Sequence, residues 1–184
     1  MTPHEAHRTD LLALTELARR DLAAMFRRWD SPDATRDGLR ASLPRLVAAY
    51  GSAAVALAAD YYEDVRALTG ARRRFRAVPA EQPDVGRTDA LARWGVTPLY
   101  AAEPDYVAAL ALVGGGLQRI VANAGRETVI ASLAADPDGR GWQRQTSGAT
   151  CGFCTSIANG GVYSYEADFN AHDYCDCIAV PVFE

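Results

Sequence analysis

All four cysteines of this chain lie in its last 34 residues, in two short clusters that also contain one histidine. Cys151 and Cys154 make up the first cluster. The second consists of His172, Cys175 and Cys177, and seventeen residues separate Cys154 from His172. Thiolate sulfur and imidazole nitrogen hold Zn²⁺ in closed tetrahedral sites, often as two pairs of ligands from two tight turns. The spacing therefore predicts a zinc site in the C-terminal part of the chain.

Two other chemistries use the same residue types. A disulfide inside either cysteine cluster would be strained, because residues so close in sequence do not easily reach the usual bridge geometry. A redox-active Cys-x-x-Cys would need a strand before it and a helix start behind it within a βαβ unit. The flanking residues 146–150 and the pair Gly160-Gly161 do not suggest one. We therefore favour a structural zinc ion over a disulfide or a redox pair.

The five candidate ligands are one more than a tetrahedral zinc ion needs. Cys151 and Cys154 form the first pair. The second is either His172 with Cys175, whose spacer suits a turn, or Cys175 with Cys177, which an extended segment places on one side. Both alternatives stay open. Three or four thiolates leave no open coordination position, so we expect one structural Zn²⁺ and no catalytic residue.

Motifs of catalytic zinc sites are missing from the sequence. A zinc nucleobase deaminase needs His-x-Glu and Pro-Cys-x-x-Cys, and neither occurs. The His-Glu-x-x-His motif of metalloproteases does not occur either. The sequence therefore indicates a metal that holds the fold together.

The composition is that of a globular protein, with 49% hydrophobic and 23% charged residues among 184. The net charge of −4 argues against a general nucleic-acid binder, and all 19 basic residues are arginine. No run of about 18 apolar residues predicts a membrane span. The N-terminal residues also lack the pattern of a signal peptide. We therefore expect synthesis in a reducing cytoplasm, which favours thiolate–zinc over disulfide chemistry.

The elements that would carry this site begin with helices. Apolar residues recur with a helical period from Thr9 to Trp29 and again over residues 39–68, and Gly70 can end the second helix. A break or kink is expected at Pro44, because proline cannot donate a helical hydrogen bond. The two segments predict a long antiparallel helical pair.

A further helical pattern opens near Pro104 and runs to Val121. Residues 114–116 are all glycine, and each costs roughly 1 kcal/mol against alanine in a helix interior. Either the helix breaks there or another backbone approaches closely. Gly125 is expected to end this run, and a last helix then covers residues 126–135.

Beyond these helices the pattern is that of strands. Residues 142–146 alternate in polarity, residues 160–165 look like a hairpin arm, and residues 178–183 read as a terminal strand. Pro181 is most easily placed on a sheet edge. The sequence therefore predicts a small β-rich unit around the candidate ligands.

The fold class that follows is mainly α. An antiparallel helical body, residues 1–140, precedes a small β-rich C-terminal zinc knuckle, residues 141–184. A unit as small as this knuckle cannot bury enough apolar surface to fold alone, so a metal staple is expected.

Arg72, Arg73, Arg74 and Arg76 surround Phe75 just after the second helical segment. Such a cluster can contact a phosphate backbone, for example packaged DNA, or an acidic partner. A solvated helix end with Phe75 in the core would produce the same pattern, because cations suit a helix C-terminus. We favour this second interpretation.

Aromatic, glycine and ligand residues of the tail form a longer motif. Its members are Trp142, Thr150–Cys154, Asn159–Tyr163, His172–Cys177 and Val180–Phe183. The motif resembles the C-terminal motif of MuF-like phage minor head proteins, especially their actinobacteriophage branch, and the resemblance covers residues 142–183. One departure is Asp173-Tyr174, where that family often has Pro-Asn. This change leaves the ligands intact and alters only the turn.

The resemblance implies a low-copy minor capsid protein that acts in phage head morphogenesis. It would be assembled in the host cytoplasm and become part of the virion, in the head interior or at the portal vertex. Its partners would be the portal and the major capsid or scaffolding protein. Packaged DNA is a further candidate through Arg72, Arg73, Arg74 and Arg76, and no membrane partner is expected.

Some relatives in that family are labelled capsid maturation proteases. The residues here offer little for that chemistry, because His172 lies near the metal and His4 and His7 lie at one end of the chain. We therefore expect no enzyme activity. The capsid maturation protease is the runner-up, and a zinc-ribbon-like module that binds nucleic acid or protein is the third alternative.

Overall fold

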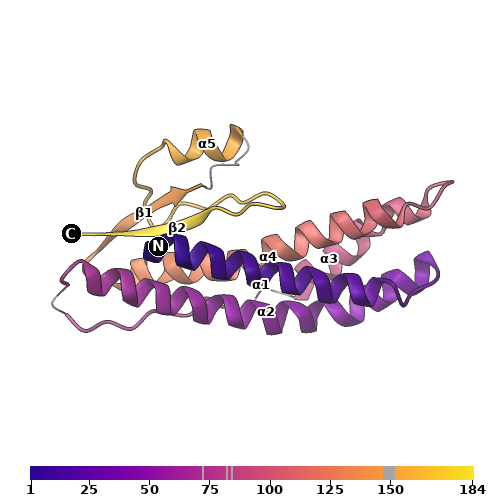
Figure 1. The fold of residues 1–184 in the computed structure, drawn as a ribbon, viewed down its shortest axis with the longest axis horizontal. Coiled ribbons are helices and arrows are strands. Elements are labelled where there is room, and N and C mark those ends of the chain that lie inside the picture. The colour runs from indigo at the N-terminus through magenta and orange to yellow at the C-terminus, as the bar shows by residue number, and fades with distance from the viewer. Residues whose placement is uncertain (72, 82, 84, 147–151) are drawn as a thin grey trace.

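The computed structural model describes residues 1–71, 73–81, 83, 85–146 and 152–184. This part of the chain is mainly helical, with a small two-stranded antiparallel sheet near the C-terminus. The long helices lie side by side, and the sheet packs near one end of them (Figure 1). The elements are α1 (Pro3–Phe26), α2 (Pro32–Leu68), α3 (Val85–Gly95), the 3-10 helix η1 (Thr97–Tyr100), α4 (Tyr106–Ala135), β1 (Gly139–Gln145), α5 (Gly152–Ala158) and β2 (Ile178–Phe183).

Local capping sets where the first two helices begin. α1 starts at Pro3, earlier than the expected Thr9, because Thr2 and Glu5 form a reciprocal capping box around a proline in the first turn. Ser31 caps α2, where its hydroxyl accepts a hydrogen bond from the amide of Ala34 at 3.3 Å. After α2, Gly70 adopts a φ of +73°, as expected for a residue that ends a helix.

α2 does not break at Pro44, which lies inside a continuous helix of 37 residues. Proline removes one backbone hydrogen bond from a helix interior. The flanking Leu43, Leu46 and Val47 are all buried in the core, so apolar packing on both sides of the proline offsets that loss. The expected break is therefore wrong.

α4 is one helix of 30 residues, and it breaks neither at residues 114–116 nor at Gly125. The glycines allow close approach instead. A Cβ on Gly116 would lie 2.4 Å from a methyl carbon of Leu91, and one on Gly125 would lie 3.3 Å from the carbonyl oxygen of Ala54 in α2. α4 can therefore lie against α2 and α3 at short range, and this packing stabilises a helix that glycine propensity alone disfavours.

β1 and β2 pair in antiparallel fashion, with Pro181 opposite Trp142. The predicted hairpin arm at residues 160–165 is reduced to a single bridge between Trp142 and Tyr163, so no third strand forms there. The Trp142 ring stacks between Tyr163 and Phe169, at centroid distances of 4.7 and 5.2 Å. A buried aromatic cluster thus takes the place of a wider sheet.

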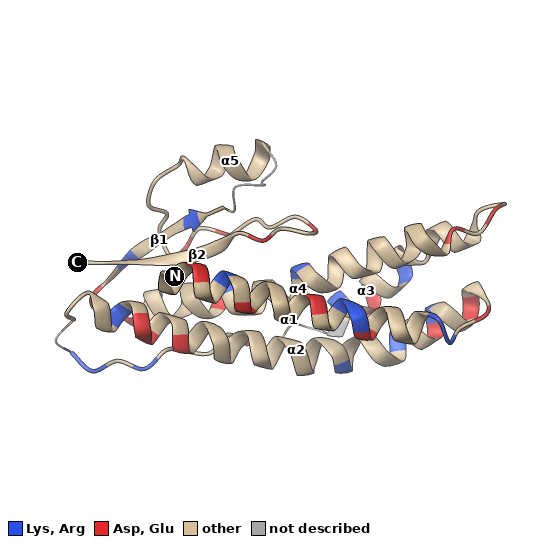
Figure 2. Ribbon diagram, in the orientation of Figure 1, with Lys and Arg blue, Asp and Glu red and all other residues tan. Residues whose placement is uncertain are grey.

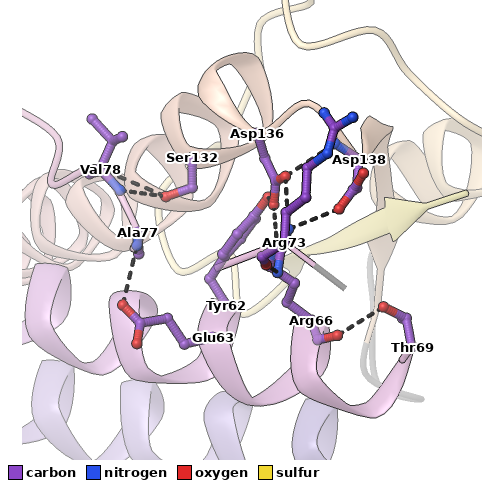
Figure 3. Close-up of polar contacts among 10 residues, drawn as sticks. All are labelled: Tyr62, Glu63, Arg66, Thr69, Arg73, Ala77, Val78, Ser132, Asp136 and Asp138. Atoms are coloured by element: carbon purple, nitrogen blue, oxygen red, sulfur yellow. Dashed lines mark hydrogen bonds and ion pairs between the residues drawn. The ribbon is translucent and has the colours of Figure 1, made fainter. Parts of the chain in front are cut away.

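A buried ion-pair network ties the C-terminal end of α2 to the turn after α4 (Figure 3). The Arg66 guanidinium donates to both carboxylate oxygens of Asp136 and to Asp138, the last at 2.8 Å. The hydroxyl of Tyr62 donates to Asp136 at 3.0 Å. Each charge of the network has a partner, as buried ion pairs require.

Two helices, α2 and α4, are long and apolar enough to cross a membrane by length and composition alone. In α4, 61% of the most apolar window is buried inside the molecule, and in α2 the share is 39%. The apolar faces of both helices pack on each other and on α1. Their hydrophobicity is accounted for by the core that they form.

Candidate metal centre

The structure brings three of the five predicted ligands together. Cys154 comes from α5, whereas His172 and Cys175 come from the loop before β2. Their donor atoms all lie within 4.8 Å of one another. The Cys154 sulfur is 3.0 Å from Nε2 of His172 and 3.9 Å from the Cys175 sulfur. One ion could therefore contact all three.

Cys177 lies beside this cluster. Its side chain is fully buried, and its thiol interacts with that of Cys175. His172, one alternative for the second pair, lies in the cluster with Cys154 and Cys175, and Cys177, the other alternative, lies next to it. Cys151, the remaining predicted ligand, lies outside the described residues. Three sulfurs and one imidazole match the donor set of structural zinc sites.

The candidate ligands lie in two different kinds of local structure. The amide of Cys175 donates to the carbonyl of His172 at 3.2 Å, which closes the tight turn expected between them. Cys154 lies in the short helix α5 and not in the simple turn that was predicted. No βαβ unit surrounds it in the described part of the chain, because β1 pairs with β2 in antiparallel fashion.

Tyr174 fixes this turn against the helical body. It has a φ of +61°, unusual for a residue other than glycine, and its hydroxyl donates to the carbonyl of Ala111 in α4 at 2.5 Å. Its ring lies where a side chain on Gly115 would be, since a Cβ there would be 2.8 Å from the ring. The Arg19 guanidinium from α1 lies 5.0 Å from the ring centroid. The absence of a side chain at Gly115 therefore leaves space for the turn between His172 and Cys175, here called the ligand turn.

Arg126 supports the ligands from inside α4. It is 2% exposed, and it donates to the carbonyl of Cys177 at 2.9 Å and to that of Cys175 at 2.8 Å. A third hydrogen bond, at 2.7 Å, goes to the side-chain oxygen of Asn123. Burial lowers the pKa of Arg126, and the negative charge of the two cysteines opposes this effect. This arginine holds both ligand residues through their backbone.

Arg144 of β1 is a second buried arginine beside the cluster. Its Nη1 lies 3.9 Å from the Cys175 sulfur, and its Nη2 donates to the carbonyl of Asn170 at 3.4 Å. Both arginines contact the Phe169 ring, with guanidinium carbons 4.7 Å (Arg126) and 3.8 Å (Arg144) from the ring centroid. Two cations next to three thiols stabilise the thiolate form, which is the form that binds metals.

The thiols themselves titrate as a pair. A hydrogen bond from Cys177 and the nearby charge of Arg126 lower the pKa of Cys175 to about 5. The same hydrogen bond and burial raise the pKa of Cys177. These shifts favour loss of the proton at Cys175 before Cys177, and a divalent cation would displace the remaining protons.

The sequence singled out the three residues that converge, Cys154, His172 and Cys175. It did not reveal Tyr174, Arg126 or Arg144 as part of the site. Arg126 was expected only as the first residue of a last helix. These residues act through contacts with segments far away in the chain, for which a single sequence carries no periodic or motif signal.

Comparisons with known proteins give one match. A family model described as VG15 protein matches residues 2–184. No curated protein and no solved structure matches the chain. The matched range includes the helical body as well as the tail with its candidate metal centre.

Proposed function

Since the chain belongs to the VG15 protein family, a family of phage proteins, we propose that it is a minor capsid protein acting in head morphogenesis. It would occur in few copies, at the portal vertex or on the inner face of the procapsid. Its partners would be the portal and the major capsid or scaffolding protein.

One observation carries the proposal: the tail that resembles MuF-like minor head proteins brings three of its candidate ligands into one cluster. Cys154, His172 and Cys175 converge from two separate segments, as a shared metal would require. Family membership supports a phage origin for the whole chain. The head role itself rests on the resemblance of residues 142–183.

We further propose that the cluster holds one structural Zn²⁺. Four of the five residues Cys151, Cys154, His172, Cys175 and Cys177 would bind it. The described sulfur donors are buried, so a bound ion would have little access to water or substrate. Such an ion would link α5 to the turn between His172 and Cys175. It would thereby stabilise the small C-terminal unit as a cross-link does.

The test of the head role is made in the infected or lysogenic host. The protein is tagged at its exposed N-terminus, and lysates are sedimented to separate heads, portal rings and soluble protein. Co-sedimentation with heads or portal rings is expected, together with defective heads when the gene is deleted. Normal heads after deletion, or protein found only in the soluble fractions, would rule out this function.

A specific contact favours the capsid maturation protease as second candidate. The 3.0 Å pair of Cys154 and His172, with Nδ1 of His172 donating to the carbonyl of Asp173 at 2.6 Å, has the order of a nucleophile, a base and an orienting group. However, Cys154 is 1% exposed, and Cys175 lies on its other side. Purified protein mixed with scaffold-filled shells should therefore give no cleavage, and specific cleavage lost in Cys154→Ser would establish the protease.

A further inference from the structure

The segment of residues 73–80, here called the strap, runs without helix or strand from the end of α2 toward α3. We propose that the strap binds the phosphate backbone of double-stranded nucleic acid through Arg73, Arg74 and Arg76. This inference goes beyond the head role and does not depend on it. It rests on two observations: hydrogen bonds hold the backbone of the strap in place, and its arginine side chains form no ion pair in the described part of the chain.

The first half of the strap is anchored by the buried network at the end of α2 (Figure 3). Arg66, which is fixed by Asp136 and Asp138, also donates to the carbonyl of Arg73 at 2.5 Å. The Phe75 ring turns inward, 5.8 Å from the Tyr62 ring, with the guanidinium carbon of Arg66 5.6 Å from its centroid. Backbone and aromatic contacts thus fix this part of the strap.

The second half is anchored by single hydrogen bonds to two helices. The amide of Ala77 donates to Glu63 at 3.1 Å. The amide of Val78 donates to the Ser132 hydroxyl at 2.9 Å, and that of Ala80 to the Thr128 hydroxyl at 3.1 Å. The strap is therefore ordered before any partner arrives, and binding through it would cost little conformational entropy.

The arginine side chains of the strap, in contrast to its backbone, are available to a partner. Arg73, Arg74 and Arg76 are all exposed, and within the described part of the chain none of them forms an ion pair. Other exposed arginines, such as Arg40 and Arg119, pair with carboxylates. Figure 2 shows the strap as a basic segment on the loop that leaves α2, on a molecule whose net charge is −4.

The arrangement fits a duplex backbone better than single strands. Guanidinium groups bind phosphate oxygens in bidentate fashion. Arg74 and Arg76 are exposed on either side of the half-buried Phe75, so both are available to a partner on the outer side of the strap. Single-strand binders stack bases on exposed aromatic rings, whereas Phe75 of the strap packs against Tyr62. The contacts would therefore be electrostatic and independent of sequence.

The expected salt dependence follows from the number of charges. Three phosphate contacts give a slope of log K against log[salt] of about −2.7, which is a loss of about 40-fold between 50 and 200 mM salt. Removing two of the three arginines should reduce the slope to about −0.9 and this loss to about 3-fold.

The experiment is a fluorescence-anisotropy titration of a labelled, mixed-sequence DNA duplex with the full-length protein at several salt concentrations. The test variant is Arg74→Ala with Arg76→Ala. The matched control is Arg27→Ala with Arg28→Ala, which removes the same charge from exposed positions after α1. Circular dichroism confirms that both variants stay folded. We expect the steep slope in the wild type and the control, and the shallow slope in the test variant.

Three results would overturn the proposal. The first is no binding by the wild type at 50 mM salt. The second is an equal loss of affinity in both double variants, which would indicate an effect of net charge without a strap site. Polyglutamate that competes as well as duplex DNA at equal charge concentration would assign the strap to an acidic protein partner.

Discussion

Replacement of Arg126 by Met separates the contribution of the metal centre from that of the core. Arg126 lies in α4 and donates to the carbonyls of Cys175 and Cys177. The negative charges that raise its pKa are those of Cys175, Cys177 and Asp176. Methionine keeps much of the buried volume and removes the charge and the donors.

The loss of unfolding free energy in this variant differs between the metal-bound and the metal-free protein. With metal bound, the variant loses the buried interaction between a cation and a thiolate centre and leaves two carbonyls without donors, which should lower the free energy of unfolding by about 3–5 kcal/mol. In the metal-free protein fewer of the thiols are deprotonated, so the cation is compensated less. There the same replacement should cost about 2 kcal/mol less, and this difference should appear as a roughly 30-fold weaker affinity for Zn²⁺.

The assay is urea unfolding with and without a chelator, combined with Zn²⁺ affinity measured by chelator competition. Arg119→Met is the matched control. Arg119 also lies in α4 and also contacts the ligand turn, through Asp173 at 2.7 Å, but its side chain is 44% exposed. An exposed pair contributes about 1 kcal/mol or less, so this control should leave zinc affinity nearly unchanged. Equal destabilisation of loaded and metal-free Arg126→Met would refute the electrostatic coupling.

Three further predictions concern single residues. Cys154→Ser should abolish stoichiometric zinc binding and make residues 152–177 sensitive to protease, with the helical circular dichroism retained; an unchanged digest contradicts a structural metal. Gly115→Ala should cost about 1–3 kcal/mol in unfolding free energy and weaken zinc binding, because its Cβ would lie 2.8 Å from the Tyr174 ring; Ala111→Gly is a helix-propensity control. Burial lowers the pKa of His7 to about 4, so metal-free protein should lose up to about 3 kcal/mol as pH falls from 6.5 to 4; an equal pH slope in His7→Phe would contradict this.

The sign of the His7 effect follows from proton linkage. The unfolded chain binds a proton at His7 near pH 6.5, whereas the folded protein resists it until about pH 4. Stability from this group is therefore complete above pH 6.5 and is lost as the pH falls through that interval. Phenylalanine at this position retains the stacking on Tyr61, which has a centroid distance of 4.1 Å, and does not titrate.

The predictions from sequence succeeded where the signal was local. The mainly helical class, the terminal strand at residues 178–183 and the convergence of Cys154, His172 and Cys175 all follow from periodicity or ligand spacing. The expected breaks at Pro44 and Gly125 were wrong. In both cases helix propensity was outweighed by burial against neighbouring helices, which a single sequence does not display.

The strap shows a different limit. Its composition allowed either a solvated helix end or a binding segment, and Phe75 does pack inward as the first interpretation expects. Only the structure shows that Arg66, Ser132 and Thr128 hold the backbone and that the arginines have no ion-pair partners in the described chain. Arg72 lies outside the described residues, so the proposed surface uses the other three arginines.

The candidate metal centre differs from an isolated zinc finger in what holds its candidate ligands in place. In an isolated finger the metal organises an unfolded peptide, and binding bears the full cost of ordering it. Here Tyr174 and Arg126 already fix the turn of Cys175 against α4. Gly115 has no side chain, which leaves space for the Tyr174 ring. Metal binding would then order mainly α5 and its link to that turn. The metal-free protein should therefore keep the pairing of β1 with β2, with slow hydrogen exchange at Gln143 and Val180. Fast exchange at those amides would show that the metal organises the whole tail.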